Sequence, residues 1–138
     1  MRAPSAGATA SFVLTGFVED VDLSALYSDA LCFVCLSRFE GFGLPPLEAM
    51  ACGTPVICTD NSSLPEVVGQ AGLLFDADDV QGVASAVQQI AASPALRKEL
   101  AEAGLERAEL FSWERCAEII TETLIAEHAN RCIALRQF

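Results

Sequence analysis

Two glutamates stand eight positions apart in this chain, and a glycine-rich loop lies between them. The two acids are Glu40 and Glu48, and the loop contains Gly41 and Gly43. An ionised carboxylate accepts hydrogen bonds from paired hydroxyl groups, and bonds to a charged acceptor are stronger than bonds between neutral groups. The two glycines leave backbone N–H groups open to the close approach of a ligand. The spacing therefore predicts a site for a ligand that carries both hydroxyl groups and negative charge.

The sequence on either side of the loop predicts the two elements that hold it. Residues 31–36 form an apolar run that is typical of a buried parallel strand. The two prolines after the loop fit the first turn of a helix over residues 46–52. A strand, a glycine loop and a helix N-terminus in succession bind anions and sugar nucleotides at the edge of open α/β sheets. We therefore expect Glu40 and Glu48 to face one open groove at that edge.

Short apolar segments alternate with helical patterns along the rest of the chain. This alternation predicts an α/β fold, with a Rossmann-like parallel sheet, flanking helices and right-handed βαβ units. The expected strands are residues 12–15, 31–36, 55–58 and 73–75. The expected helices are 23–28 with Asp22 as N-cap, 46–52, 65–68, 80–92 after Asp78 or Asp79, 94 to about 110 after Ser93, and 113–128 after Ser112.

The overall composition limits the classes of protein to which the chain can belong. Its 138 residues allow one domain with a core, and 52% hydrophobic residues argue for a folded chain. The formal net charge of −11 argues against a nucleic-acid partner, because such proteins cluster lysine and arginine. No apolar run approaches the about 20 residues of a transmembrane helix, and the N-terminus lacks the apolar stretch of a signal peptide.

The six cysteines do not follow the spacing of a metal site. Cys32 and Cys35 are three positions apart on the predicted strand, so their side chains should point to opposite faces of the sheet. We therefore expect reduced cysteines that act as small apolar residues, and no metal.

Several segments, taken in order, resemble the retaining glycosyltransferases of family 4, which have the GT-B fold. The run from Glu40 to Glu48 is similar to the family's motif of two glutamates separated by seven residues. The resemblance covers about residues 11–128 and is specific for the family but not for the substrate. The other matching segments are residues 12–18, 26–30, 48–57, 64–69 and 71–75.

The resemblance implies a role for each residue of the predicted site. Glu40 corresponds to the catalytic glutamate that contacts hydroxyls of the donor sugar, and Glu48 corresponds to the glutamate that holds the ribose. Val18 matches a position that lines the nucleobase in relatives, although a loop residue covering the core would fit the same position. No metal and no cofactor are implied. The backbone of the loop between the acids would lie against the sugar and phosphates, through Gly41, Phe42, Gly43 and Leu44.

The resemblance also implies that this sequence is one part of a larger enzyme, namely an incomplete GT-B C-terminal domain. The acceptor domain would lie outside it, as would the opening βα units, which carry the family's diphosphate-binding Arg and Lys. Either a piece of a longer protein or a truncated gene would account for this. We expect residues 1–10 to be disordered, residues 11–128 to form the nucleotide-sugar-binding unit, and residues 129–138 to form a tail.

The implied partners are a UDP- or GDP-sugar donor and an acceptor that the sequence does not identify, either a sugar, a lipid-linked sugar or a small molecule. The family's members imply a cytoplasmic location. An incomplete sheet would also leave an edge strand through which the chain could associate.

Three other functions compete with the transfer of a hexose from a nucleotide sugar. A nucleotide-sugar epimerase would share the two-domain fold, but the family match disfavours it. A glycoside hydrolase would need one acid with a raised pKa, whereas glycine N–H groups and a helix N-terminus keep carboxylates ionised. The main alternative is a non-catalytic, truncated fragment that binds a nucleotide weakly or associates with a partner.

Overall fold

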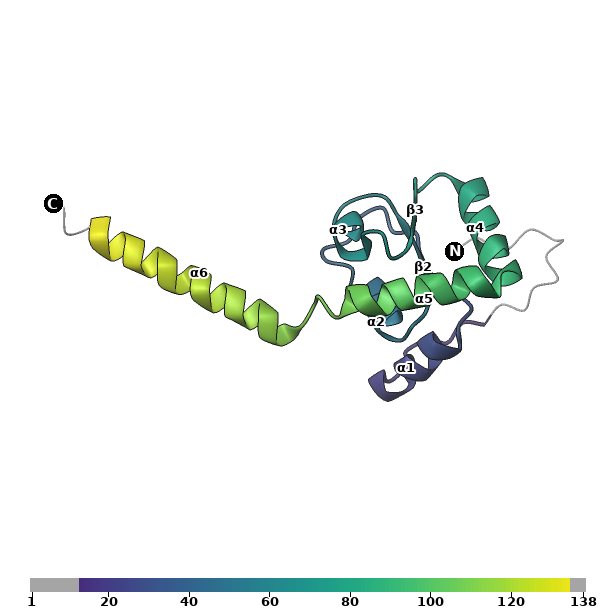
Figure 1. Ribbon diagram of the computed structural model, residues 1–138, viewed down its shortest axis with the longest axis horizontal. Helices are drawn as coiled ribbons and strands as arrows, with labels where there is room; N and C mark the ends of the chain where they lie inside the picture. Colours follow the sequence, from purple (N-terminus) through teal and green to yellow (C-terminus); the bar gives the residue numbers. More distant parts are fainter. Residues whose placement is uncertain (1–12, 135–138) are drawn as a thin grey trace.

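The structure is a computed structural model that describes the backbone of residues 13–134 and the side chains of residues 13–128. Figure 1 shows a compact body of short strands and helices, from which one long helix extends. The predicted disordered segment, residues 1–10, lies outside the described residues. In chain order the elements are α1 (Asp20–Asp29), β1 (Phe33–Cys35), α2 (Leu44–Ala51), β2 (Val56–Thr59), α3 (Leu64–Val68), β3 (Leu73–Phe75), α4 (Val80–Ala92), α5 (Pro94–Ala108) and α6 (Trp113–Ala134).

The three strands form one parallel sheet in the order β1-β2-β3. Phe33 pairs with Val56 at the start of the β1–β2 ladder, and Ile57 pairs with Leu73 at the start of the β2–β3 ladder. A helix connects each strand to the next, since α2 follows β1 and α3 follows β2. The predicted α/β fold with a Rossmann-like parallel sheet is therefore confirmed for the segments near residues 31–36, 55–58 and 73–75.

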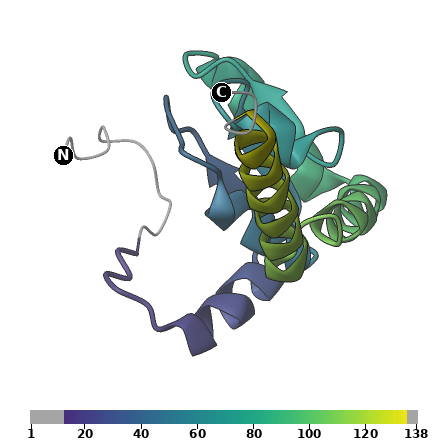
Figure 2. The same ribbon diagram turned by 90° about the vertical axis from the view of Figure 1, so that its left-hand side faces the viewer.

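The predicted strand at residues 12–15 is wrong over the part that the structure describes. Residues 13–15 have no strand structure, and the side chains of Val13 and Leu14 are 77% and 68% exposed. In Figure 2 this purple segment runs apart from the strands. A strand forms only where a neighbour pairs with its backbone groups, and none of the three described strands pairs with this segment. Its apolar pattern is therefore not sufficient to make it a strand.

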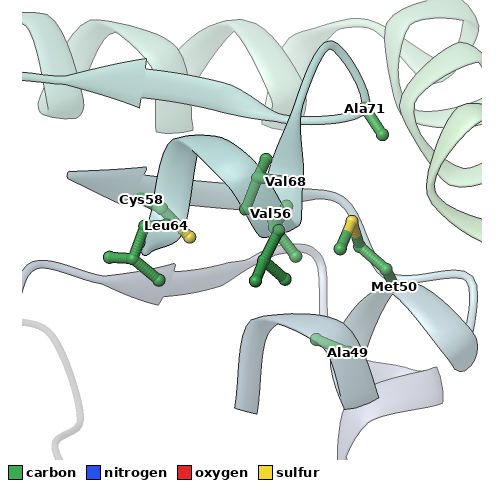
Figure 3. Close-up of a cluster of buried hydrophobic side chains, with 8 residues drawn as sticks. Ala49, Met50, Val56, Cys58, Leu64, Val68 and Ala71 are labelled. Atoms are coloured by element: carbon green, nitrogen blue, oxygen red, sulfur yellow. The ribbon is translucent and has the colours of Figure 1, made fainter. Parts of the chain in front are cut away.

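The central strand β2 explains the position of the core. All four of its residues are buried. Val56 and Cys58 belong to one hydrophobic cluster with residues of α2 and α3, which Figure 3 shows, while Ile57 belongs to a second cluster with residues of α4 and α5. Successive side chains of a strand point to opposite faces, so a strand covered on both faces is largely apolar, and the terminal Thr59 is the polar exception in β2.

The helix caps agree with the sequence at three of four positions. Asp79 accepts a hydrogen bond from the backbone N–H of Gly82 at 2.8 Å, and Ser93 Oγ accepts one from Leu96 at 3.2 Å. Ser112 Oγ accepts one from Arg115 at 3.0 Å and caps α6, which continues through residues 129–134. The exception is α1, where Asp22 lies within the first turn and is not the N-cap. Acidic side chains are favourable throughout the first turn because of the helix dipole, so the sequence alone did not separate the two positions.

None of the described helices has the length and apolar character needed to cross a membrane.

Candidate functional site

The loop that carries Arg38, Glu40 and the two glycines follows the carboxyl end of β1 and ends at the first turn of α2, as predicted. Gly43 is the N-cap of α2 and has a left-handed backbone, with φ of 105°. A Cβ at this position would lie only 2.9 Å from Leu64 Cδ2. The conformation and the close packing against α3 therefore both require glycine there. Gly41 is different, because a Cβ there would meet open space.

The N-terminus of α2 is not capped by any described side chain. Pro45 and Pro46 occupy its first turn, where they lack N–H groups that would otherwise be unpaired. Leu44 is exposed, and the ring of the exposed Phe42 packs edge-on against Phe111 with 6.1 Å between the ring centroids. The positive end of the helix dipole is therefore accessible to an anion from outside the chain.

Glu40 is half-buried and is held by its neighbours on three sides. Its backbone N–H donates to Ser62 Oγ at 3.0 Å, and its backbone oxygen accepts from Ser63 Oγ at 3.2 Å. Its carboxylate Oε1 lies 4.0 Å from the thiol of Cys35, the last residue of β1. The loop after β2 thus holds the backbone of Glu40, and the last residue of β1 contacts its carboxylate.

Glu48 is exposed on α2, and its partner comes from α1. The hydroxyl of Tyr27 donates to Glu48 Oε2 at 3.2 Å. Burial raises the pKa of the Tyr27 hydroxyl, and the neighbouring Glu48 carboxylate raises it further. Thr54 Oγ1 donates to the backbone oxygen of Tyr27 at 2.6 Å, which ties α1 to the residues that follow α2. The structure therefore connects Glu40 to the loop after β2, and Glu48 to α1. That the two glutamates face one groove remains a prediction.

Val18 and Arg38 are two further residues to consider beside the predicted site. Val18 is half-buried in the segment between Gly16 and α1, and no described hydrogen bond joins it to the loop. Arg38 lies in the loop itself and pairs with Asp78, and both side chains are exposed. An exposed ion pair is worth at most about 1 kcal/mol, so Arg38 can leave Asp78 for another anion at little cost.

The cysteines occupy the positions that their spacing predicted. Cys35 packs against the cluster that contains Cys58, whereas Cys32 packs against the cluster on the opposite face. The cysteines of the described part of the chain are free: Cys32, Cys35, Cys52, Cys58 and Cys116. In that same part, no three His, Cys, Asp or Glu side chains come together as metal ligands would.

The sequence did not single out Tyr27, Thr59, Ser62 or Ser63 as parts of the site. Thr59 Oγ1 donates to the backbone oxygen of Ser37 at 2.6 Å, next to the two serine contacts with Glu40. A signal was present, because the polar run from Asp60 to Ser63 follows a predicted parallel strand, and the carboxyl ends of such strands meet at one edge. No comparable pattern pointed to Tyr27, which is 21 positions from Glu48.

A parallel sheet with flanking helices, in which a glycine loop leads from the carboxyl edge to an uncapped helix N-terminus, defines an α/β domain of the Rossmann-like class. The chain belongs to the family described as glycosyl transferases group 1, whose model matches residues 2–107.

Similar proteins and a similar solved structure agree with that family. The chain is 47% identical over 111 residues to the O-antigen chain mannosyltransferase B of Escherichia coli. The matched region is 80% of this chain and 28% of that protein. It is 43% identical over 102 residues to the alpha-maltose-1-phosphate synthase of Mycolicibacterium smegmatis, and the matched region is 67% of this chain and 26% of that protein. The solved sucrose-phosphate synthase of Thermosynechococcus elongatus matches with a TM-score of 0.75 at 36% identity, covering 83% of this chain and 30% of that chain. The chain thus spans less than a third of each of these proteins, and its predicted fold, part of a GT-B C-terminal domain, is confirmed.

Proposed function

We propose that this chain is part of the donor-binding domain of a retaining glycosyltransferase of family 4, which transfers a hexose from a UDP- or GDP-sugar to an acceptor. The observation that carries the proposal is the loop of Glu40 and Gly43, which joins the carboxyl end of β1 to the uncapped N-terminus of α2. The similar mannosyltransferase and synthases support transfer of a sugar as the class of reaction.

The proposed roles follow from the chemistry of each group. Glu40 accepts hydrogen bonds from hydroxyls of the donor sugar, and Glu48 accepts those of the ribose. The backbone of Gly41 and Gly43, with the adjoining Phe42 and Leu44, lies along the sugar and the phosphates. Val18 lines the nucleobase.

The loop and the helix also have an electrostatic role. When the bond to the sugar breaks, negative charge develops on the leaving diphosphate, and backbone N–H groups that already point toward it stabilise that charge. At the N-terminus of α2 only Gly43 and Leu44 carry such groups, because Pro45 and Pro46 have no N–H, and the helix dipole adds to their effect. Arg38 stands in the same loop and, once it leaves Asp78, adds a positive charge. These groups require no metal or cofactor.

Nuclear magnetic resonance on the chain itself tests the proposed donor site. We expect millimolar GDP-mannose or UDP-glucose to shift the amide signals of Gly41, Gly43 and Leu44, with much smaller changes in α4. Free mannose, which lacks the diphosphate, serves as the control ligand and should shift these signals less. Equal shifts with mannose, or shifts spread evenly over the protein, would contradict a diphosphate-binding loop.

We propose a second property, association through the edge strand, on a separate observation. Among the described strands β1 pairs only with β2, on one side, and its Val34 is 39% exposed. Unpaired backbone groups beside exposed apolar side chains favour pairing with another strand. Light scattering over a range of concentrations would reveal such association, and Val34→Lys should reduce it. A wild-type chain that remains monomeric at high concentration would contradict this property without affecting the donor site.

A further inference from the structure

We propose that Ser62 and Ser63, in the loop after β2, position Glu40 for its ligand. Neither serine needs to touch the ligand, because each acts through the backbone of the glutamate. That the Glu40 carboxylate binds the donor sugar rests on the proposed function. The hydrogen bonds between the two serines and the Glu40 backbone can be tested separately.

Three hydrogen bonds join the last residue of β2 and the segment after β2 to the segment after β1. Thr59 Oγ1 donates to the backbone oxygen of Ser37, Ser62 Oγ accepts from the N–H of Glu40, and Ser63 Oγ donates to the backbone oxygen of Glu40. The two serines therefore engage both backbone polar groups of the same residue. A loop residue held at its donor and at its acceptor has little freedom to rotate, so the direction of its side chain is also restricted.

The conformation of Ser62 is the second observation. Its φ of 48° makes it the one non-glycine residue with a left-handed backbone in the described part of the chain. Such a conformation costs about 1–2 kcal/mol in an L-residue and persists where the surroundings over-determine it. It turns the chain so that Ser62 Oγ reaches Glu40 N at 3.0 Å.

The third observation is that Ser63 does not cap the helix it precedes. Ser63 occupies the N-cap position of α3, and a serine there normally accepts a hydrogen bond from the first turn. Its side chain makes no such cap bond and donates instead to the backbone oxygen of Glu40 at 3.2 Å. The hydroxyl is thus directed across the sheet edge to the glutamate and away from its own helix.

The carboxylate adds a fourth contact. Cys35 ends β1, and its thiol lies 4.0 Å from Glu40 Oε1. With the backbone fixed by the two serines, this contact leaves the carboxylate beside the carboxyl end of the sheet. The loops after β1 and after β2 thereby act together, although only the first of them carries Glu40.

Hydrogen exchange on the chain as it stands tests the hold on the backbone. Ser62→Gly adopts the left-handed conformation without strain and removes the CH2OH side chain, including the oxygen that accepts from the Glu40 amide. We expect the exchange protection of that amide to fall about fivefold or more, which is the effect of losing one ordinary hydrogen bond. The control is Ser85→Ala, which removes a hydroxyl that accepts a hydrogen bond from Gln89 on α4 and should leave Glu40 unchanged.

The outcomes separate positioning from general stability. The amides of β2 should keep their protection in every variant, since the core is untouched. Unchanged protection at Glu40 would overturn the proposal, and so would a loss that extends over β2, which would show that the serines support the whole fold.

Donor binding provides the functional test. If GDP-mannose or UDP-glucose shifts the loop signals of the wild-type chain, Ser63→Ala should weaken that binding about threefold or more, and Ser63→Thr should restore it. Unchanged affinity in Ser63→Ala would overturn the positioning role. If neither donor binds the wild-type chain, the proposed donor site fails, and the exchange experiment alone decides whether the serines hold Glu40.

Discussion

At the scale of single residues, the two loop glycines differ in what they do for the protein. Gly43 has a left-handed backbone and packs against Leu64, whereas Gly41 has neither constraint. Gly43→Ala should therefore lower the free energy of unfolding by about 1–2 kcal/mol or more, through the strained φ and the clash. Gly41→Ala should change it by less than about 0.5 kcal/mol. Urea unfolding of both variants measures the difference.

The same pair of glycines also tests the site. Because no described atom lies within 4 Å of a Cβ at position 41, an effect of Gly41→Ala on donor binding would come from the ligand. We expect that variant to be stable but to bind GDP-mannose or UDP-glucose more weakly. If the two variants prove equally stable, the steric account of Gly43 is wrong.

The role of Glu40 is best tested in a longer protein that contains this chain and transfers sugar. Glu40→Gln keeps the size of the side chain but replaces a charged acceptor by a neutral amide. We expect it to remove most of the transfer activity while the protein remains folded. The control is Glu99→Gln on the exposed face of α5, which should retain activity. Unchanged turnover in Glu40→Gln would refute the assigned role.

At the scale of elements, the central strand carries a titratable group inside the core. Cys58 is fully buried in β2. Burial raises the pKa of its thiol from 9.0 to about 12, and the neighbouring Cys35 adds to this effect. The folded chain therefore retains a proton that the unfolded chain releases above pH 9. The corresponding stability is fully present below pH 9 and is lost as the pH rises toward 12.

This pKa shift predicts a steep alkaline transition. Between pH 9 and pH 12, the free energy of unfolding should fall by up to about 1.4 kcal/mol per pH unit because of this one group. Cys58→Ala removes the thiol and should flatten the slope, although the variant starts from a lower stability because of the cavity. Cys116→Ala, at an exposed cysteine of α6, is the matched control and should keep the wild-type slope. Parallel pH profiles for wild type and Cys58→Ala would contradict the assignment.

At the scale of the whole molecule, the charge and the extent of the chain limit what it does alone. The net charge is −11, and the chain spans 28% of the similar mannosyltransferase. A diphosphate would meet the glycine loop, the dipole of α2 and Arg38 in an otherwise acidic protein. A helix N-terminus contributes about 1–2 kcal/mol toward an anion, which is small beside the entropy lost on association.

We therefore predict that the isolated chain binds UDP- and GDP-sugars with an affinity no better than about millimolar and does not transfer sugar. Well-oriented reactants can gain about 7–11 kcal/mol from positioning, and that gain requires an acceptor held in line with the donor. Calorimetry with the two donors and an assay for nucleotide release provide the measurement. Micromolar binding or sustained turnover would show that these 138 residues supply more of the site than their charge suggests.

The sequence by itself determined the features that depend on local pattern. Apolar runs predicted β1, β2 and β3, and helical periodicity with Asp79 and Ser93 as caps predicted α4 and α5. The order of strand, glycine loop and helix predicted that Glu40 follows the carboxyl end of β1. These features are local because propensity, alternation and capping act over a few residues.

Only the tertiary structure decided which distant residues meet. The sequence could not show that residues 13–15 lack a strand partner, that Tyr27 bonds to Glu48, or that Ser62 and Ser63 hold the backbone of Glu40. The hydrogen bonds join residues that are more than 20 positions apart, and a strand at residues 13–15 would need a second strand to pair with. Pairing and side-chain contact depend on position in space, and a pattern of residue types along the chain does not specify it.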